Sequence, residues 1–176
     1  MKDIELSIIL EELEGDKLHS SLEKLYPLRE KFWQEVNEGK SYLDDFEKKT
    51  SKAFCLLSKY GYLLGRYDSI TLPEIDTYNT TEVPIGLISE LFVLKQYRKC
   101  GIGRMLINSV QEFIGKNQEL PLILGCDNKL VTFYKLCNFL SINNYHSKDT
   151  SLMLWTPVLG SIVERFEKLF LSPNKN

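Results

Sequence analysis

The sequence predicts a mixed α/β domain, and three observations support this fold class. Apolar runs of strand length alternate with segments that have the period of an amphipathic helix, as expected of α/β proteins. The length of 176 residues suits a single domain with one core, spanning residues 1–176. Hydrophobic residues make up 43% of the chain and charged residues 26%, a balance typical of folded globular proteins.

The amino-terminal third is expected to contain a strand and a helical region. Residues 4–12 form an apolar run of strand length, and residues 16–50 have helical spacing. Pro27 and Gly39 predict that this region is two or more helices rather than one. One face of the helical region is apolar: Leu18, Leu22, Leu25, Leu28, Phe32 and Val36.

The rest of the chain alternates strands and helices. Two β-rich runs around Tyr60 and Gly61 predict a hairpin, and residues 72–84 are expected to form a polar loop. Residues 85–94 are a strong strand, followed by a helix from about Gly101 to Lys116. The remaining elements are expected in the order strand, helix, strand, strand and helix, at residues 120–126, 128–137, 138–146, 150–157 and 158–171.

Charge and composition argue against several classes of function. Lys and Arg total 22 against 24 Asp and Glu, so binding of nucleic acid through bulk charge is not expected. No apolar run has the length of a membrane span, and the acidic residues near the amino terminus argue against a signal peptide. Neither a zinc site nor a disulfide framework is indicated by the spacing of the cysteines, which are expected as free thiols in the cytoplasm: Cys55, Cys100, Cys126 and Cys137.

The run Arg98-Lys99-Cys100-Gly101-Ile102-Gly103 carries the strongest functional signal, because two glycines stand between a strand and a helix. Glycine allows close backbone approach, and the first helical turn has amide hydrogens without intrahelical partners. With the charges of Arg98, Lys99 and Arg104, these amides predict a phosphate or pyrophosphate site. A plain strand-to-helix turn is the alternative. The P-loop pattern is absent, and Leu106 replaces the third glycine of a dinucleotide fingerprint.

The segment from Glu90 to Ile107 resembles the acetyl-CoA-binding motif of the GCN5-related N-acetyltransferases, the GNAT superfamily, whose [QR]-x-x-G-x-[GA] pattern appears at residues 98–103. A second motif resembles the family's Asn, Phe-Tyr and Gly-Phe run, with Asn138 in place of the glycine: Asn128, Phe133, Tyr134, Asn138 and Phe139. Asparagine tolerates the left-handed end of a helix, so the departure is mild. The resemblance covers about residues 4–156. It implies a mostly antiparallel central sheet flanked by helices, with an extra carboxy-terminal helix.

By this resemblance, the protein moves an acetyl group from acetyl-CoA to a primary amine by direct attack in a ternary complex. The backbone of Phe92 and Val93 is expected to pair with the pantetheine arm, and the Val93 amide to polarise the thioester carbonyl. The amides of residues 100–104 are expected to hold the pyrophosphate. Asn128 is expected near the CoA arm, as the N-cap of a helix, or as both. No metal is expected.

Two side chains are expected to carry the chemistry. Tyr134 occupies the position of the family's general acid, and a phenol with a pKa of about 10 suits protonation of a leaving thiolate. A core aromatic residue is the alternative. Glu90 is the only acid on its strand, with Ser89 beside it, and is expected to be the base that deprotonates the amine; an ion pair with a surface lysine is the alternative. His19 and His146 are weaker candidates for the base.

The acceptor is left open by the sequence. A small-molecule amine is favoured, with a protein lysine or amino terminus as the alternative, and a non-catalytic acyl-CoA-binding module as a rival of another class. Residues 16–50, 71–84 and 140–150 are expected to surround the acceptor, and the acidic and aromatic residues of the first region could receive a cation or simply form a solvated helix. The carboxy-terminal helix is expected either to pack on its own domain or to make a homodimer contact.

Overall fold

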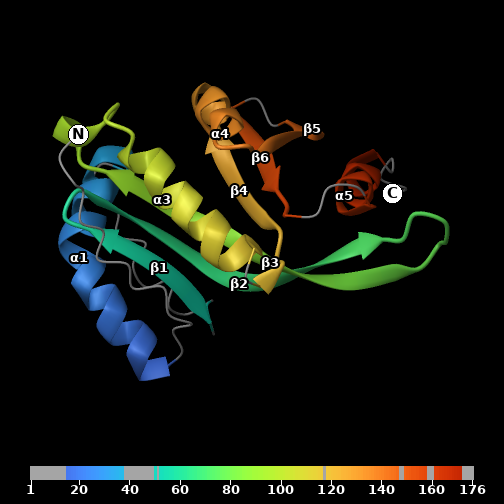
Figure 1. Cartoon of the computed structure of the whole chain (residues 1–176), viewed down its shortest axis with the longest axis horizontal. Helices are drawn as coiled ribbons and strands as arrows, with labels where there is room; N and C mark the ends of the chain where they lie inside the picture. The colour runs from blue at the N-terminus through green and yellow to red at the C-terminus, as the bar shows by residue number, and fades with distance from the viewer. Residues whose placement is uncertain are drawn as a thin grey trace. The chain divides into compact units, whose positions relative to one another are not determined.

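The computed structural model describes residues 15–37, 50, 52–116, 118–146, 149–157 and 161–171. The strand expected at residues 4–12 lies outside this part of the chain. By its contacts the chain divides into two compact units, the first formed by Met1–Tyr67 and Ile88–Val110 and the second by Asp68–Leu87 and Gln111–Asn176. Figure 1 shows the ribbon of the chain, and the single domain remains a prediction.

The strands form a six-stranded sheet with the order β1-β2-β3-β4-β6-β5. Their bounds are Ala53–Ser58 for β1, Gly61–Pro73 for β2, Thr80–Val93 for β3, Leu122–Asp127 for β4, Leu140–His146 for β5 and Thr150–Trp155 for β6. The pairs β1–β2, β4–β6 and β5–β6 are antiparallel, and β3–β4 is parallel. This arrangement confirms the predicted mixed α/β fold with a mostly antiparallel sheet.

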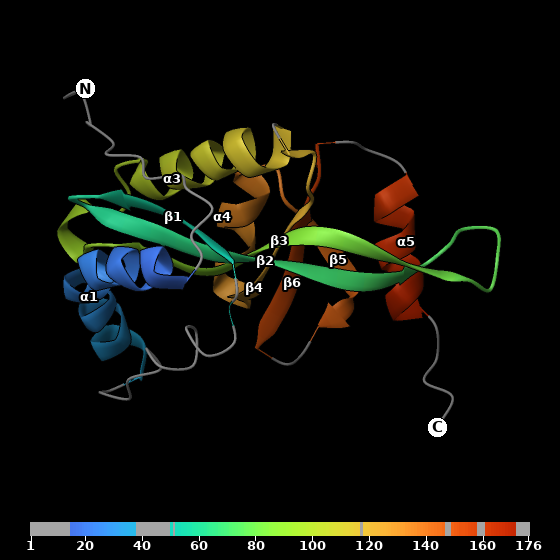
Figure 2. The same ribbon diagram turned by 90° about the horizontal axis from the view of Figure 1, so that it is seen from below.

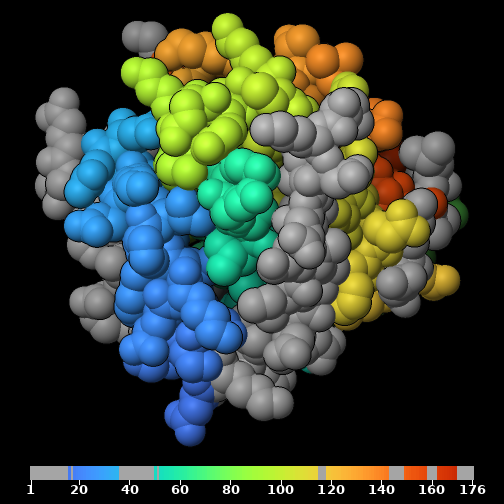
Figure 3. Space-filling model, turned by 60° about the vertical axis from the view of Figure 1, so that its left-hand side comes forward, coloured from blue at the N-terminus to red at the C-terminus, as the bar shows by residue number. Residues whose placement is uncertain are grey.

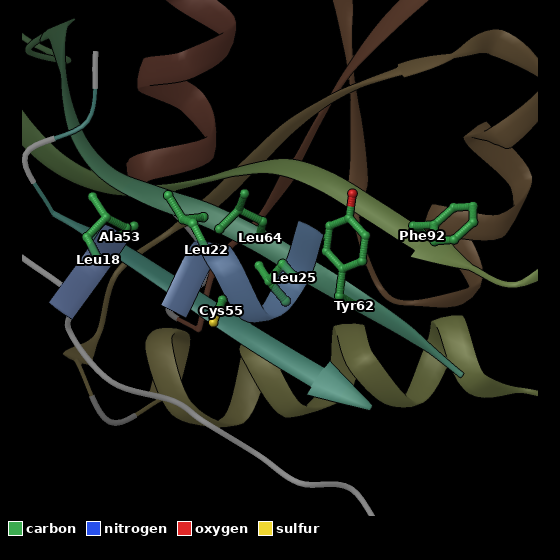
Figure 4. Packing of buried hydrophobic residues seen from close by; sticks show 8 residues of the cluster. All are labelled: Leu18, Leu22, Leu25, Ala53, Cys55, Tyr62, Leu64 and Phe92. Atoms are coloured by element: carbon green, nitrogen blue, oxygen red, sulfur yellow. The ribbon is translucent and has the colours of Figure 1, made fainter. Parts of the chain in front are cut away.

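In the first unit, helix α1 (Gly15–Asn37) covers one face of the strands. Leu18, Leu22 and Leu25 are at most 5% exposed and pack on the strands. Figure 4 shows this cluster, which also contains Ala53, Cys55, Tyr62, Leu64 and Phe92. Helix α3 (Ile102–Val110) lies on the opposite face (Figure 2). The apolar stripe predicted for α1 is therefore confirmed from Leu18 to Phe32, and the side chain of Val36 lies outside the description.

Helix α1 continues through Pro27, so the prediction that this proline separates two helices is wrong. Proline removes one helical hydrogen bond and usually kinks or ends a helix. In a regular helix, the amide at position 27 would donate to the Glu23 carbonyl. Pro27 has no amide hydrogen, but Pro27 and Glu23 both lie on the exposed side of α1, which is open to water. Packing of Leu22 and Leu25 in the core favours the continuous helix over the local preference. The region around Gly39 lies outside the described residues.

In the second unit, helix α5 (Ser161–Leu171) packs on a separate apolar cluster. Phe166 is fully buried there, in a cluster that also contains Leu72, Ile85, Ile123, Ile142 and Leu154. Arg165 Nε donates to the Pro73 carbonyl at 3.0 Å, and Lys168 Nζ donates to the carbonyls of Glu74 and Ile75 at 2.7 and 2.8 Å. Of the two expectations for the carboxy-terminal helix, packing on its own part of the chain is therefore confirmed.

The polar loop expected at residues 72–84 is shorter than predicted. Strand β2 continues to Pro73 and β3 begins at Thr80, so the turn contains only residues 74–79. Glu74 holds this turn closed, because its carboxylate accepts hydrogen bonds from Thr77 and Thr81 at 2.8 and 3.1 Å. The β-branched residues Thr80, Thr81 and Val83 favour the strand, although the segment as a whole is polar.

The remaining helices lie close to their predicted positions. The helix expected up to Lys116 begins as α3 and ends as a π-helical segment, Gln111–Lys116. The helix expected at residues 128–137 is a 3₁₀ turn, Asn128–Leu130, followed by α4, Val131–Leu136. Gln111 Nε2 donates to the Cys137 carbonyl at 2.7 Å, which joins the π-helical segment to the end of α4.

Candidate active site

The turn after β3 has the backbone geometry that its glycines predict. A short 3₁₀ segment, Lys95–Tyr97, follows the strand, and Lys99 and Gly101 have positive φ values of 63° and 84°. The Met105 amide donates to the Gly101 carbonyl at 3.0 Å, so α3 begins at Ile102. Glycine is required at position 101, because an L side chain is strained at this φ. The first amides of α3 thus follow a tight turn, as expected of an anion site.

Arg98 turns its side chain back onto the end of β3. Its Nε donates to the Val93 carbonyl at 2.9 Å, and its guanidinium lies 5.7 Å from the centre of the Phe92 ring. The guanidinium also pairs with the Glu35 carboxylate of α1. These contacts hold Arg98, at the start of the turn after β3, against the strand and against α1. On the space-filling surface, α1, the β1–β2 turn and the segment after β3 are exposed side by side (Figure 3).

The end of β3 also packs closely on the start of β2. A side chain at Gly61 would place its Cβ 2.1 Å from the Phe92 carbonyl oxygen, so only glycine allows this approach. The Leu94 amide donates to the Tyr60 carbonyl at 2.9 Å. The Phe92 side chain is 3% exposed and belongs to the core of the first unit. The parallel ladder with β4 pairs Gly86 and Leu87, so Phe92 and Val93 lie beyond it.

Glu90 is buried in a network of side chains, with 6% of its surface exposed. Arg29 of α1 donates to both carboxylate oxygens, from Nη2 to Oε1 at 2.7 Å and from Nε to Oε2 at 3.0 Å. The Tyr62 hydroxyl donates to Oε2 at 2.7 Å. The alternative that Glu90 pairs with a surface lysine is wrong, because its partner is a buried arginine. Ser89, the neighbouring residue, is exposed.

The charges of this network support one another. Burial opposes the charge of Arg29, but the hydrogen bonds and the negative charge of Glu90 outweigh burial and raise the pKa of Arg29. Burial, followed by the negative charge of Glu90, raises the pKa of Tyr62 well above its ordinary value. Tyr62 therefore stays protonated and remains a donor to the carboxylate.

In the second unit, Tyr134 lies in the last turn of α4, which ends in a Schellman motif. The Phe139 amide donates to the Tyr134 carbonyl and the Asn138 amide to the Lys135 carbonyl, both at 3.0 Å. Asn138 has a φ of 64°, which confirms that asparagine replaces glycine at a left-handed helix end. The rings of Tyr134 and Phe139 pack edge to face with centres 5.8 Å apart. This motif fixes the backbone of Tyr134.

The Tyr134 side chain is 6% exposed. Burial, with smaller contributions from the thiols of Cys126 and Cys137, raises the pKa of Tyr134 above its ordinary value. The phenol therefore stays protonated at neutral pH, which a proton donor requires. It is also a weaker acid than the free side chain, so its match to a leaving thiolate is less close than the sequence predicts.

Asn128 is not the N-cap of its helix, so this alternative is wrong. The cap is Asp127, whose Oδ1 accepts from the Lys129 amide at 2.8 Å. Asn128 Oδ1 instead accepts a hydrogen bond from Ser151 Oγ of β6 at 2.6 Å. The Asn128 amide donates to the Asp149 carbonyl at 3.1 Å.

His19 is exposed on α1 beside Glu23, and the side chain of His146 lies outside the description. All four cysteines are free thiols, and only Cys100 is exposed. In the described part of the chain, no group of three or more His, Cys, Asp or Glu residues is arranged to hold a metal ion.

Residues 33–154 match a protein-family model described as the acetyltransferase (GNAT) domain. The chain belongs to the GNAT family. The matched range contains every residue expected at the cofactor and catalytic positions, from Glu90 to Tyr134. No curated protein sequence matches this GNAT chain.

Solved structures share the GNAT fold at low sequence identity. Arabidopsis thaliana NAA60 in complex with acetyl-CoA is 16% identical, with a TM-score of 0.52 over 85% of this chain and 99% of NAA60. A Lactobacillus plantarum protein described as a candidate N-acetyltransferase is also 16% identical, with a TM-score of 0.60 over 87% and 99% of the two chains. Arabidopsis thaliana Naa50, bound to the bisubstrate analogue CoA-Ac-MVNAL, is 20% identical, with a TM-score of 0.50 over 85% and 99%. These matches show the fold.

Three residues of this GNAT chain that contact the candidate site residues were not predicted from the sequence: Arg29, Tyr62 and Glu35. Arg29 carries a detectable signal, since it stands four residues after Leu25 and three before Phe32, within the apolar stripe of α1. A charge at a core position requires a buried partner. Strand β3 begins earlier than predicted and carries two acids, so Glu90 is not the only acid on its strand; of the two, Glu90 is buried and Glu82 is exposed. Tyr62 and Glu35 carry no such signal. Among the described residues, no helix has the length and apolar character needed to cross a membrane.

Proposed function

We propose that this GNAT protein transfers an acetyl group from acetyl-CoA to the primary amine of a small molecule. The observation that carries this proposal is the family match over residues 33–154, which includes an R-x-x-G-x-G turn in which Gly101 is left-handed. The four free thiols support the proposal that the protein works in a reducing compartment, the cytoplasm.

Acetyl-CoA would be held mainly by backbone atoms. The amides of residues 100–104, at the start of α3, would bind the pyrophosphate, with Lys99 and Arg104 adding positive charge. The backbone of Phe92 and Val93 lies beyond the ladder with β4 and would pair with the pantetheine arm as an added strand does. Asn128 would contact the same arm. The Arg98 side chain, which bonds Val93 and Glu35, would contribute charge and hold the strand end in place.

The proposed reaction forms a C–N bond and breaks a C–S bond. An ammonium ion of the acceptor first loses a proton to Glu90, through a water molecule, and the neutral amine attacks the thioester carbonyl. The Val93 amide stabilises the oxyanion that develops. When the C–S bond breaks, Tyr134 gives its proton to the CoA thiolate and is reprotonated by solvent. The nitrogen, which is positively charged after the attack, loses its second proton to water, and Glu90 returns its own proton to solvent. The products are the acetylated amine, CoA thiol and one proton released to solvent.

A peptide amino terminus or a protein lysine is the second acceptor class. The solved structures of the same fold include Naa50 with an analogue that joins CoA to the peptide MVNAL. That likeness concerns the fold, so small amines and peptides belong in the same acceptor screen. A non-catalytic acyl-CoA-binding module would bind acetyl-CoA in that screen and acetylate no amine.

The first experiment measures acetyl-CoA binding by calorimetry, with NADH and ATP as controls. Acetyl-CoA alone is expected to bind to the wild type. Gly103→Glu should abolish binding, because its carboxylate would stand in the first turn of α3, where the pyrophosphate is proposed to bind.

The matched control is Asn108→Glu, which adds the same charge at an exposed position farther along α3. This variant should bind acetyl-CoA as the wild type does. If the wild type does not bind, or if both variants bind equally well, the turn is a plain connection between strand and helix.

A further inference from the structure

We propose that Arg29 and Tyr62 are positioning residues for Glu90, and that they leave one acceptor site of its carboxylate, on Oε1, for the proton of the amine. This inference rests on the proposed function, because it assigns roles around the proposed base. Neither residue would touch the substrate. Their role would be to fix where the carboxylate lies and how readily it accepts a proton.

The hydrogen bonds of Glu90 identify the available atom. A carboxylate has about four lone-pair sites, two on each oxygen. Oε2 accepts from Arg29 Nε and from the Tyr62 hydroxyl, so its two sites are occupied. Oε1 accepts from Arg29 Nη2. Within the described residues no second donor reaches Oε1, and this oxygen therefore has one site left for a water molecule or an ammonium group.

The surroundings of Glu90 make its orientation rigid. Arg29 is fully buried and binds the carboxylate through two parallel hydrogen bonds, a geometry that fixes the plane of both groups. Tyr62 is also fully buried, and its ring packs on Phe32 of α1 and on Phe92 of β3. A carboxylate held in this way cannot rotate to exchange its two oxygens without breaking all of these contacts.

The same donors bind the charged form of the carboxylate. Arg29 and Tyr62 both stabilise the anion, and Tyr26 of α1 lies close enough to contribute to the electrostatics of Arg29. If Glu90 accepts the amine proton, loss of one donor must therefore make the anion a stronger base. A purely structural network would have no effect on the pH dependence of the reaction.

The test compares the pH dependence of kcat/KM in the wild type and in Tyr62→Phe, with the same amine acceptor. The proton equilibrium of the acceptor is common to both proteins, so any difference belongs to the enzyme. The acid limb should move to higher pH in Tyr62→Phe, because a hydrogen bond to the charged form of the proposed base is lost. Glu90→Gln should lower kcat by about a hundredfold.

The matched control is Tyr60→Phe. Tyr60 stands two positions before Tyr62, and within the described residues its hydroxyl makes no hydrogen bond. The pH profile of Tyr60→Phe should therefore coincide with that of the wild type. If Tyr62→Phe does not fold, Arg29→Lys serves instead, since it keeps the charge, loses the two-pronged contact and should move the limb in the same direction.

The outcomes separate this inference from the proposed function. An active wild type with coincident profiles for the wild type and Tyr62→Phe would overturn the inference and leave the acetyltransferase in place. A wild type that binds acetyl-CoA and acetylates no amine would overturn the proposed function, and the inference with it. An acid limb that shifts in Tyr62→Phe and not in Tyr60→Phe supports both the inference and the proposed function.

Discussion

At the scale of single residues, Tyr134 illustrates how burial both supports and limits a proposed proton donor. Its phenol is 6% exposed, and burial raises its pKa, so the proton is retained at neutral pH. A donor must be protonated to act, and its contribution is lost as the pH rises through its own pKa. Because that pKa is raised, Tyr134 should cause no fall in rate below about pH 10, the ordinary value of a phenol.

Replacement of Tyr134 by phenylalanine tests this role. The ring keeps its contact with Phe139, while the proton for the leaving thiolate is lost. We expect kcat to fall by about a hundredfold, the lower range for general acid catalysis, with the calorimetric affinity for acetyl-CoA retained.

The control for this change is Tyr78→Phe, at a fully exposed position in the β2–β3 turn, which should leave kcat unchanged. Equal rates in Tyr134→Phe and the wild type would assign Tyr134 to the core alone. In that case the thiolate would take its proton from another group or leave unprotonated.

At the scale of elements, the end of α4 shows what a short motif can predict. The Phe-Tyr pair followed by Asn138-Phe139 predicts a helix that ends in a left-handed residue, and the Schellman motif confirms it. The motif is local: four neighbouring residues decide its hydrogen bonds, so the sequence is sufficient. The same holds for the β1–β2 hairpin and for the glycine turn after β3.

Asn138→Ala should destabilise the protein by about 1 kcal/mol, because alanine lacks the side chain that favours the left-handed region. Asn138→Gly should be close to the wild type, since glycine adopts this φ without strain but loses more backbone entropy on folding. Urea unfolding measures both. Thr132→Ala, an exposed change on the same helix, is the control and should be neutral or slightly stabilising.

Elements that depend on distant contacts were predicted less well. The turn at residues 74–79 appeared longer in the sequence because its strands are polar, and pairing across the hairpin decides where the strands end. Pro27 predicted a helix boundary, but packing of the apolar face of α1 keeps the helix continuous. Local propensity was overruled in both cases by contacts that a single segment does not contain.

At the scale of the whole molecule, the Arg29–Glu90 pair joins residues that are 61 positions apart. The base role and a surface-lysine partner were the two predictions for Glu90, and the buried Arg29 partner was not predicted because the pairing depends on how α1 lies on β3. Whatever chemistry Glu90 performs, a substitution at Glu90 or Arg29 also affects the stability of the fold, because the ion pair is buried. Each partner is at most 6% exposed, so removing one of them leaves a buried charge without its counterion.

Stability and activity can be separated by a double substitution. Arg29→Met alone should lower the free energy of unfolding by about 3–5 kcal/mol, because it leaves the Glu90 carboxylate buried without its counterion. Arg29→Met combined with Glu90→Met should recover most of this loss, since a buried ion pair is often replaceable by apolar side chains of similar volume. Glu35→Met, which breaks the exposed pair with Arg98, is the matched control and should cost at most about 1 kcal/mol.

If Glu90 is the base, the double variant regains stability and acetyl-CoA binding and stays deficient in acetyl transfer. A stable double variant with the wild-type rate would instead assign the pair to folding alone.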